Sequence, residues 1–204
     1  SALTHSMNKE ERQALRDSLR QARLDLNPDE QSAAAQNLHD LVAEQDFFMN
    51  ASHIAFYQGM DGEIDPKPLL DKALAEGKSC YLPTLSKDSS GQMSFAPYDH
   101  DTELTENNWG IGEPTLPDEE ISPTNFDVVF VPLVGFDENC FRLGMGKGFY
   151  DRTFSFKIFN RHSRPLLVGL AHECQLTDSF TTASWDVRLD AVITAKKIYR
   201  PDTA

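Results

Sequence analysis

Cysteine is scarce in this 204-residue sequence, and its spacing builds no recognisable site. The three cysteines, Cys80, Cys140 and Cys174, are an odd number and include no C-x-x-C pair. This pattern argues against a disulfide framework and against a thiolate metal site, and it is typical of a reducing compartment. We therefore expect a cytoplasmic protein.

Long apolar runs are also absent. No stretch approaches the roughly 18 residues that a membrane-spanning helix needs, and no signal peptide is visible. We therefore expect no membrane partner. The segment SALTHS (residues 1–6), which precedes Met7, resembles an expression remnant. The remaining length suits one domain over residues 7–204.

Basic residues are few as well. Lys and Arg number 19 against 32 Asp and Glu, which gives a formal net charge of −13. Proteins that hold a nucleic-acid backbone are usually basic, so we expect no nucleic-acid partner. Residues 99–120 contain eight acids and no Lys or Arg, which indicates a solvated surface loop. Residues 142–164 contain six Lys or Arg and one acid, and such a segment is where a small anion would be held.

Helical patterns alternate with buried-strand patterns along the chain. Asn8 and Asn27 are each followed three residues later by Glu, which is a helix-start signature. The first helix is expected to place Leu15, Leu19 and Ala22 on one face. Its arginines are expected largely on other faces; they are Arg12, Arg16, Arg20 and Arg23.

A further helix is expected after Asp65-Pro66, ending at Gly77, and another over residues 149–159. Short apolar runs predict strands at residues 53–57, 79–83, 93–97, 126–136, 165–171 and 189–194. This alternation predicts an α/β fold with three layers, α/β/α, around a central, mostly parallel sheet. In such sheets ligands bind beyond the carboxyl ends of the strands.

The segment RLGMGKGFYDR (residues 142–152) carries glycine at every second position, 144, 146 and 148. Glycine is kept at such density where the backbone has positive φ or approaches a ligand closely. The segment is neither a P-loop nor a dinucleotide fingerprint, because its spacing is G-x-G-x-G and Gly148 follows Lys147. Backbone N–H groups, Arg142, Lys147 and the start of the following helix favour a site for anionic oxygens over a ligand-free turn.

The longer segment PLVGFDENCFRLGMGKGFYDR (residues 132–152) closely resembles the signature of the 5-formyltetrahydrofolate cyclo-ligases, also called methenyltetrahydrofolate synthetases. The segments at residues 12–16, 62–70 and 185–194 are similar to further parts of that family, so the resemblance covers most of the chain. One position departs from the family pattern, because its first basic residue is often lysine and here it is Arg12.

The resemblance implies an enzyme that converts 5-formyltetrahydrofolate to 5,10-methenyltetrahydrofolate with ATP and Mg²⁺, releasing ADP and phosphate. It implies that the γ-phosphoryl group is transferred to the formyl oxygen, so that a phosphorylated formyl intermediate forms. The expected partners are these two small-molecule substrates, and we expect a monomer.

Residue roles follow from the resemblance by position. ATP binding is expected of Arg12, Arg16, Arg142, Leu143, Gly144, Met145, Gly146, Lys147, Gly148, Phe149 and Tyr150, with Lys147 and Tyr150 catalytic. Folate binding is expected of Gln58, Glu63, Trp109, Met145, Gly146, Lys147, Gly148 and Phe149. Asp151 and Asp186 are expected to hold Mg²⁺, since hard oxygen ligands suit that ion.

Plainer interpretations exist for several of these residues. From the sequence alone, Asp151 and Asp186 are typical helix-turn or loop residues, and Glu63 is typical of an exposed loop acid before a helix. Trp109 is equally a wall near the substrate and a tryptophan that packs in a buried core or in a loop. The segment AHEC (residues 171–174) lacks the second histidine of a zinc motif, so a packed His172 at a strand end is expected. Cys140 has no implied histidine partner, so we do not expect a nucleophile there.

Two other functions stay open: a folate- or nucleotide-binding protein without turnover, and a kinase of another small metabolite. The joint presence of Lys147, Tyr150, Asp151 and Asp186 favours the cyclo-ligase over the binding protein. The segment around Glu63 favours it over the kinase, which would have less reason to keep a folate contact.

Overall fold

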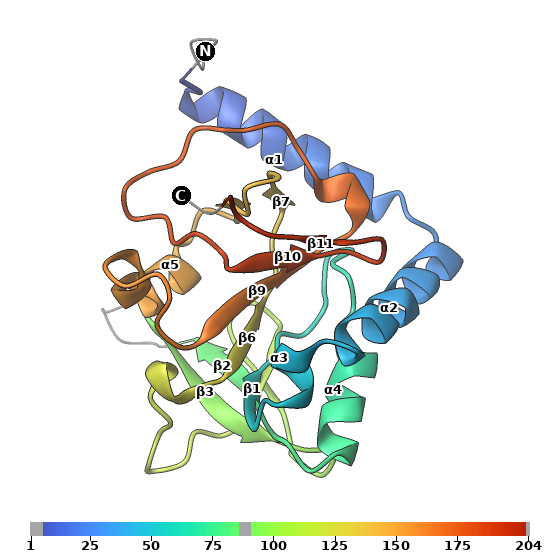
Figure 1. Cartoon of the computed structure of the whole chain (residues 1–204), viewed down its shortest axis with the longest axis vertical. Coiled ribbons are helices and arrows are strands. Elements are labelled where there is room, and N and C mark those ends of the chain that lie inside the picture. Colours follow the sequence, from blue (N-terminus) through green and yellow to red (C-terminus); the bar gives the residue numbers. More distant parts are fainter. Residues whose placement is uncertain (1–5, 86–90, 203–204) are drawn as a thin grey trace.

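A computed structural model of the chain describes residues 6–85 and 91–202. A seven-stranded sheet with the order β11-β10-β9-β6-β1-β2-β3 forms its centre (Figure 1). The inner strands are parallel: β1 (His53–Ala55), β2 (Ser79–Leu85), β6 (Val128–Val131), β9 (Leu166–Leu170) and β10 (Ala191–Ile193). The edge strands β3 (Met93–Tyr98) and β11 (Ile198–Tyr199) are antiparallel to their neighbours. The predicted central, mostly parallel sheet is confirmed.

Helices cover both faces of this sheet. One face packs against α2 (Pro28–Ala43), α3 (Asp46–Met49) and α4 (Lys67–Ala75), and the other packs against α5 (Phe149–Thr153) and the 3₁₀ turn η2 (Ser155–Ile158). Side chains of β6 alternate between the two layers. Val128 and Phe130 pack toward α2–α4, whereas Val129 and Val131 pack toward α5. A strand buried on both faces explains the continuous apolar run of the sequence.

Helix α1 (Lys9–Leu24) lies at the top of the molecule, apart from the two helical layers (Figure 1). Asn8 caps it, since its Oδ1 accepts a hydrogen bond of 2.8 Å from the N–H of Glu11. The face that α1 turns to the protein carries Leu19 together with Arg12, Arg16 and Arg23. The prediction that these three arginines lie on other faces is therefore wrong. Their guanidinium groups bind backbone carbonyls of distant segments, which are those of Thr181 for Arg12, Gly144 for Arg16, and Asp61 and Leu133 for Arg23.

The other expected helix signals hold in part. The predicted capping box at Asn27 is present, with bonds of 2.8 and 3.0 Å between Asn27 and Glu30. Gly77 follows α4 with φ +78°, as its predicted role in ending the helix requires. The helix expected over residues 149–159 is shorter, because α5 ends at Thr153 and η2 follows. Phe154 turns its ring fully into the core at that break.

Two small hairpins and two short turns lie outside the sheet. The hairpins are β4 (Thr105–Glu106) with β5 (Gly112–Glu113), and β7 (Gly135–Phe136) with β8 (Arg142–Leu143); the turns are η1 (Pro123–Asn125) and η3 (Glu173–Gln175). The single strand expected over residues 126–136 therefore breaks after Val131. The acidic run at residues 99–120, expected as a loop, contains the β4–β5 hairpin.

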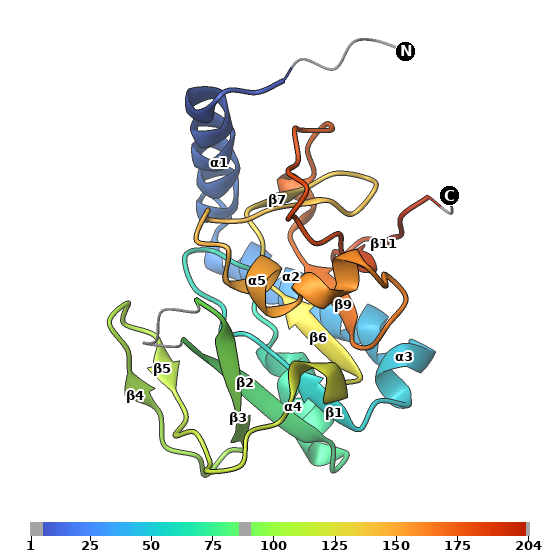
Figure 2. The same cartoon turned by 90° about the vertical axis from the view of Figure 1, so that its left-hand side faces the viewer.

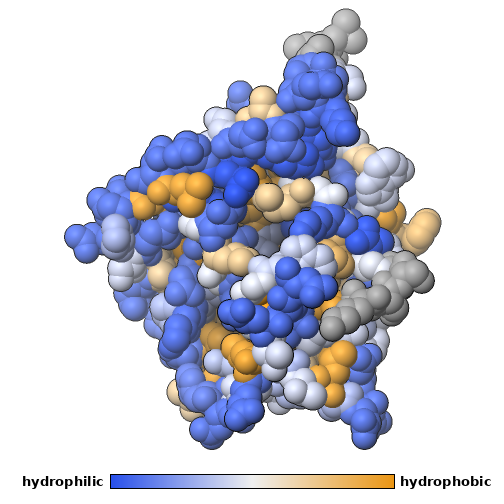
Figure 3. Space-filling view, turned by 180° about the vertical axis from the view of Figure 1, so that it is seen from behind, coloured by the Kyte–Doolittle hydropathy of each residue, from blue (hydrophilic) through white to orange (hydrophobic). Residues whose placement is uncertain are grey.

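The surface seen in Figure 3 is mainly hydrophilic, and its apolar side chains lie in small, separate patches. Across residues 6–85 and 91–202, none of the helices is long and apolar enough to cross a bilayer. Residues 1–5 of the predicted expression remnant lie outside the described residues. The assignment of residues 7–204 to one domain stays a prediction.

Candidate active site

The predicted site residues gather where the parallel strands end at their carboxyl side. Residues 56–66 follow β1, residues 132–148 follow β6, and His172 follows β9. Helix α1 stands upright above the sheet, and the β4–β5 hairpin lies beside β2 and β3 (Figure 2). The expected position of a ligand in an open α/β sheet therefore coincides with the segments that carry the sequence motifs.

The glycine stretch, residues 144–148, lies against the inner face of α1. Gly146 and Gly148 have φ of +93° and +72°, which explains why glycine stands at both positions. The Nε of Arg16 donates a hydrogen bond of 2.8 Å to the carbonyl of Gly144. A Cβ at Gly146 would lie 3.5 Å from the same guanidinium. The structure thus brings together a basic residue of α1 and a stretch 128 residues further along the chain.

The two residues before the glycines have structural roles. Leu143 is fully buried, and its carbonyl accepts a hydrogen bond of 2.9 Å from the N–H of Val134. Arg142 donates from Nε to the carbonyl of Pro132 at 2.9 Å, and its guanidinium carbon lies 5.1 Å from the centroid of the Tyr150 ring. The guanidinium is thereby held over the ring at the edge of the glycine stretch.

Tyr150 lies at the start of α5, beneath Arg142. Its ring stacks on that of Phe154, with 6.5 Å between the centroids. Burial raises the pKa of the phenol, and the nearby charge of Arg142 opposes that shift. The hydroxyl therefore stays protonated near neutral pH and can donate a hydrogen bond.

Trp109, Lys147 and Phe149 meet at the border between the glycine stretch and the β4–β5 hairpin. The Nζ of Lys147 lies 4.8 Å from the centroid of the Trp109 ring, and that ring meets Phe149 edge-on at 6.2 Å. Trp109 is 45% exposed, so its interpretation as a core residue is wrong. The side-chain amide of Gln58 donates to the carbonyl of Gly112, which fastens the hairpin to the segment after β1.

Glu63 lies half-buried in the segment after β1. Its Oε1 accepts a hydrogen bond of 3.2 Å from the N–H of Met60. Burial raises the pKa of the carboxyl to about 7, although the charge of Arg23 and the bond from Met60 oppose this shift. The interpretation as an exposed loop acid is therefore wrong. The charge of Arg142 also lowers the pKa of Glu63, and the charge of Glu63 raises the pKa of Tyr150. Glu63, Arg142 and Tyr150 therefore form one electrostatic cluster, the Glu63 cluster.

Asp151 and Asp186 face one region together with the first two arginines of α1. The Oδ1 of Asp151 accepts 2.9 Å from the N–H of Val187, and the Oδ2 of Asp186 accepts 2.8 Å from the N–H of Ala183. Burial raises the pKa of Asp151, the bond from Val187 and the charge of Arg142 oppose that shift, and the charge of Asp186 adds to it. The Nη2 of Arg12 lies 3.9 Å from Asp186. Each aspartate thus uses one carboxylate oxygen to accept a hydrogen bond from the loop before β10. The other oxygen of each carboxylate can bind another partner.

The arrangement of the two carboxylates suits a metal that shares its shell with a ligand. Within residues 6–85 and 91–202, His, Cys, Asp and Glu form no group of three that could hold a metal ion. Mg²⁺ is usually bound by one or two carboxylates plus phosphate oxygens and water rather than by a complete protein cage. Asp151 and Asp186 therefore fit that ion when a nucleotide supplies further oxygens.

The second half of the basic segment at residues 142–164 does not face this site. Lys157 is buried and donates 2.7 Å bonds to the carbonyls of Ser163 and Pro165, and its Nζ lies 3.0 Å from Asp190. Arg164 pairs with Asp127 at 2.7 Å. The prediction that this segment holds an anion is therefore too broad, because these two cations stabilise the fold instead.

Arg23 and Asp61 are not among the site residues that the sequence predicted. Arg23 is only 1% exposed, and it binds Asp61 in the segment before Glu63. The spacing of Arg12, Arg16, Leu19 and Arg23 is four, three and four residues, which places them on one helical face. That spacing is the signal that could have revealed an inward-facing arginine.

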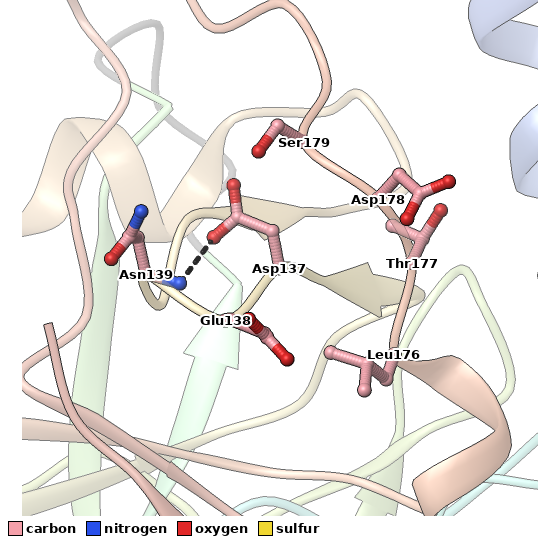
Figure 4. A pocket seen from close by; sticks show the side chains of 7 residues that line it. All are labelled: Asp137, Glu138, Asn139, Leu176, Thr177, Asp178 and Ser179. Carbon is pink, nitrogen blue, oxygen red and sulfur yellow. Dashed lines mark hydrogen bonds between the residues drawn. The ribbon is translucent and has the colours of Figure 1, made fainter.

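A pocket of about 460 Å³ lies elsewhere, between the turn at residues 137–139 and residues 176–179 (Figure 4). It contains none of the predicted site residues, and Asp137, Glu138 and Asp178 make its lining acidic. The Oδ1 of Asp137 accepts 3.0 Å bonds from the N–H groups of Asn139 and Phe141 and so stabilises the turn. Such a lining would repel phosphate and carboxylate ligands.

A family model described as the 5-formyltetrahydrofolate cyclo-ligase family matches residues 8–195. The chain belongs to this family. The resemblance stated from residues 132–152 is therefore confirmed, as is the expectation of a cyclo-ligase enzyme. Among cyclo-ligases of known sequence, that of Escherichia coli K12 is 37% identical over 182 residues, which are 89% of this chain and 98% of the relative. That of Haemophilus influenzae is 37% identical over 185 residues, which are 90% and 97% of the two chains.

Solved structures of cyclo-ligases share the fold. The 5,10-methenyltetrahydrofolate synthetase of Aquifex aeolicus superposes with a TM-score of 0.79 at 27% identity, covering 95% of this chain and 94% of that one. The synthetase of Mycoplasma pneumoniae superposes with a TM-score of 0.69 at 26% identity, covering 91% and 99%. The three-layer α/β fold is therefore that of the cyclo-ligase family.

Proposed function

We propose that this protein converts 5-formyltetrahydrofolate to 5,10-methenyltetrahydrofolate, with ATP as co-substrate and Mg²⁺ as metal, and releases ADP and phosphate. The observation that carries the proposal is the contact between Arg16 and the glycine stretch, 2.8 Å from Nε to the carbonyl of Gly144. This contact joins helix α1 and the segment at residues 142–150, the two parts of the chain that the resemblance assigns to ATP. The Glu63 cluster lies next to them through Arg142 and Tyr150.

The reaction needs activation because a formamide carbon is a poor electrophile and its oxygen is a poor leaving group. Transfer of the γ-phosphoryl group to the formyl oxygen corrects both faults. The neighbouring folate nitrogen then attacks the formyl carbon, the C–O bond to phosphate breaks, and the N–H proton of that nitrogen is released. The protein must therefore hold phosphates, position the folate and stabilise charge on the transferred group.

The phosphates are assigned to cations and backbone N–H groups. Arg16 and Arg142 lie against the glycine stretch, and Arg12 precedes Arg16 by one turn of α1. The backbone N–H groups of residues 145–149 are assigned to the same phosphates. Lys147 is exposed and carries a compact charge on a flexible stem, so it can follow the transferred phosphoryl group. The protonated hydroxyl of Tyr150 is a donor for the same oxygens. Because α5 has only five residues, its dipole adds little.

Asp151 and Asp186 would hold Mg²⁺ together with nucleotide oxygens. When bound, the ion neutralises negative charge on phosphate oxygens and aligns them. Burial and the like charge of Asp186 both disfavour the ionised form of Asp151. A bound cation would offset both effects, which supports this assignment.

The folate is assigned to the other half of the site. A carboxylate at Glu63 matches the paired donors of a reduced pterin, as in other charge-assisted pairs. The exposed rings of Trp109 and the half-buried ring of Phe149 offer apolar walls. Gln58, whose amide binds the carbonyl of Gly112, and the exposed Met145 are assigned to this half as well.

The test is incubation of the purified chain with 5-formyltetrahydrofolate, ATP and Mg²⁺. We expect the near-ultraviolet absorbance of the methenyl product to rise and ADP and phosphate to form in equal amounts. Binding of both ligands without an absorbance change would instead identify a binding protein. ADP formation with an unrelated acceptor and none with the folate would identify a kinase.

We infer further that the protein acts as a monomer in the cytoplasm. All three cysteines are unpaired, which supports a reducing compartment. Light scattering behind size-exclusion chromatography tests the monomer, since a mass near 46 kDa rather than 22.9 kDa would contradict it.

A further inference from the structure

The Glu63 carboxyl is carried by a tight turn, residues 60–63, with an unusual backbone. The N–H of Glu63 donates 3.0 Å to the carbonyl of Met60, which closes the turn. Asp61 and Gly62 both have positive φ, +56° and +77°. An Asp-Gly pair adopts two successive left-handed conformations readily, so the shape of the turn is local. The position of the turn relative to the rest of the site needs support from outside the turn.

Arg23 of α1 supplies this support through all three nitrogens of its guanidinium. Nε donates 2.7 Å to the carbonyl of Asp61, and Nη2 lies 3.0 Å from the Asp61 carboxylate. Nη1 donates 3.1 Å to the carbonyl of Leu133, just after β6. One side chain therefore connects the turn after β1, the end of β6 and helix α1.

Gly62 completes the contact between the turn and the helix. A Cβ at Gly62 would lie 3.1 Å from both the carbonyl oxygen and the Cγ of Arg23, so only glycine allows this approach. Gln31 of α2 donates 3.0 Å to the carbonyl of Gly62 and 3.3 Å to the carbonyl of Arg23. The turn is thus fixed against α1 by its backbone as well as by the Asp61 side chain.

A buried arginine is a costly way to fill space. Arg23 is 1% exposed, and an apolar side chain would cover the same surface without the desolvation of a charge. A guanidinium offers something else, because its planar fork fixes the direction of the groups that it binds. Here those groups are the carbonyl and carboxylate of Asp61, two residues before Glu63.

We propose that Arg23 is a positioning residue, which holds the Asp61–Gly62 turn against α1 and thereby sets the Glu63 carboxyl for the folate. The proposal rests on the proposed function, in which Glu63 contacts the pterin. Arg23 is proposed to act through this turn rather than by touching either substrate. The same helical face carries Arg16, which binds the glycine stretch, so α1 fixes the nucleotide half and the folate half of the site relative to each other.

The experiment compares the wild type with Arg23→Met and Arg23→Lys by the absorbance assay. We expect Arg23→Met to raise KM for 5-formyltetrahydrofolate about tenfold or more, because a small displacement of a positioned group is costly. KM for ATP should stay within about twofold, since the glycine stretch is anchored by Arg16. Arg23→Lys keeps the charge but loses the planar fork, so its KM for 5-formyltetrahydrofolate should lie between those of the wild type and Arg23→Met.

Arg20→Met is the matched control. Arg20 lies one turn away and also binds the Asp61 carboxylate, with Nη2 at 2.7 Å, but it is partly exposed and holds no carbonyl of the turn. The KM of Arg20→Met for the folate should differ from that of the wild type by less than about twofold, because surface substitutions usually have small effects. An equal effect of Arg20→Met and Arg23→Met would overturn the role of Arg23.

Asp61→Asn covers the case in which Arg23→Met does not fold. It leaves the guanidinium bonded to two carbonyls and weakens only the charged contact, so a smaller rise in the folate KM is expected. If the variants lower Tm but leave the folate KM unchanged, or raise both KM values equally, the inference fails while the proposed function stands. A wild type that forms no methenyl product would instead overturn the proposed function itself.

Discussion

The ammonium group of Lys147 lies 4.8 Å from the centroid of the Trp109 ring. The two residues come from the glycine stretch and from the β4–β5 hairpin, which are far apart in the sequence. An exposed cation–π contact is worth only about 0.5–1 kcal/mol. The lysine is therefore held at the site without being fixed, and it can move to a phosphoryl oxygen at small cost.

Lys147→Met should lower turnover at saturating ATP and folate by roughly 10²–10³-fold, the usual effect of removing one preorganised electrostatic donor. The reason is that a charge which follows the phosphoryl group interacts more strongly with the transition state than with bound ATP. The stem keeps its length and apolar contact, so Tm of the free protein should hardly change. The measurements are kcat from the absorbance assay and a thermal melt.

Lys67→Met serves as the control for this prediction, since Lys67 is an exposed lysine of α4 that pairs with Asp71 at 2.8 Å. It should leave kcat unaltered. Near wild-type turnover of Lys147→Met at saturation would show that the lysine only clamps ATP in the ground state.

Glu63→Gln should stabilise the free protein at alkaline pH while weakening folate binding. The pKa of Glu63 is raised to about 7 from 4.5, so protonated Glu63 contributes stability that is complete below about pH 4.5 and is lost as pH rises through 7. Gln is neutral throughout. The free energy of unfolding of the variant minus that of the wild type should therefore increase between pH 5 and pH 8.5, by about 1–3 kcal/mol.

Urea unfolding at the two pH values measures this difference. Calorimetry should show a loss of folate affinity of about 1–3 kcal/mol at neutral pH and a smaller loss for ATP, because one edge of the pterin is left unpaired. A difference in unfolding free energy that is flat with pH would refute the raised pKa. Equal losses for both ligands would make Glu63 a structural residue.

The sequence predicts the sheet and the glycine stretch well because both depend on local patterns. The valine-rich run of β6 indicates burial on both faces. Dense glycine indicates a backbone that takes positive φ, as Gly146 and Gly148 do. The inward face of α1 was less predictable. Arginine is usually a surface residue. The partners of Arg23 are the carbonyl and carboxylate of Asp61 after β1 and the carbonyl of Leu133 after β6, which only the tertiary structure brings together.

The hairpin that carries Trp109 illustrates the same limit. Its two strands have two residues each and no apolar alternation, so they depend on contacts with distant segments. Glu113 accepts 2.8 Å from the N–H of Leu85, and Gln58 binds Gly112. Such contacts leave no periodic signal in the sequence.

Cys140 offers a test of backbone strain within the signature segment, residues 132–152. It is a non-glycine residue at φ +66°, fully buried, with its Sγ 3.3 Å from the carbonyl of Tyr199. Cys140→Ala and Cys140→Gly both remove the sulfur, but only Gly is free of the left-handed penalty. We expect Cys140→Gly to be more stable than Cys140→Ala by about 1 kcal/mol, or roughly 2–4 °C in Tm.

The reverse order is expected at Ala33, an exposed position inside α2, where glycine should cost about 1 kcal/mol relative to alanine. If Cys140→Gly and Ala33→Gly both destabilised relative to alanine by the same amount, the left-handed backbone at Cys140 would be refuted.

Asp151→Asn tests whether Asp151 of α5 is a metal ligand or only holds the loop at Val187, because the two roles predict opposite results. Asn keeps an oxygen for the N–H of Val187 and removes a carboxylate whose pKa is raised by burial. Tm of the free protein should therefore be maintained or rise slightly. In the wild type, ATP with Mg²⁺ at 100 times the dissociation constant adds about 2.7 kcal/mol, or roughly 5–11 °C. The variant should lose most of this shift, whereas ATP with a chelator should stabilise both proteins equally. A full Mg²⁺-dependent rise in Tm of Asp151→Asn would show that Asp151 only binds the N–H of Val187 and does not hold the metal.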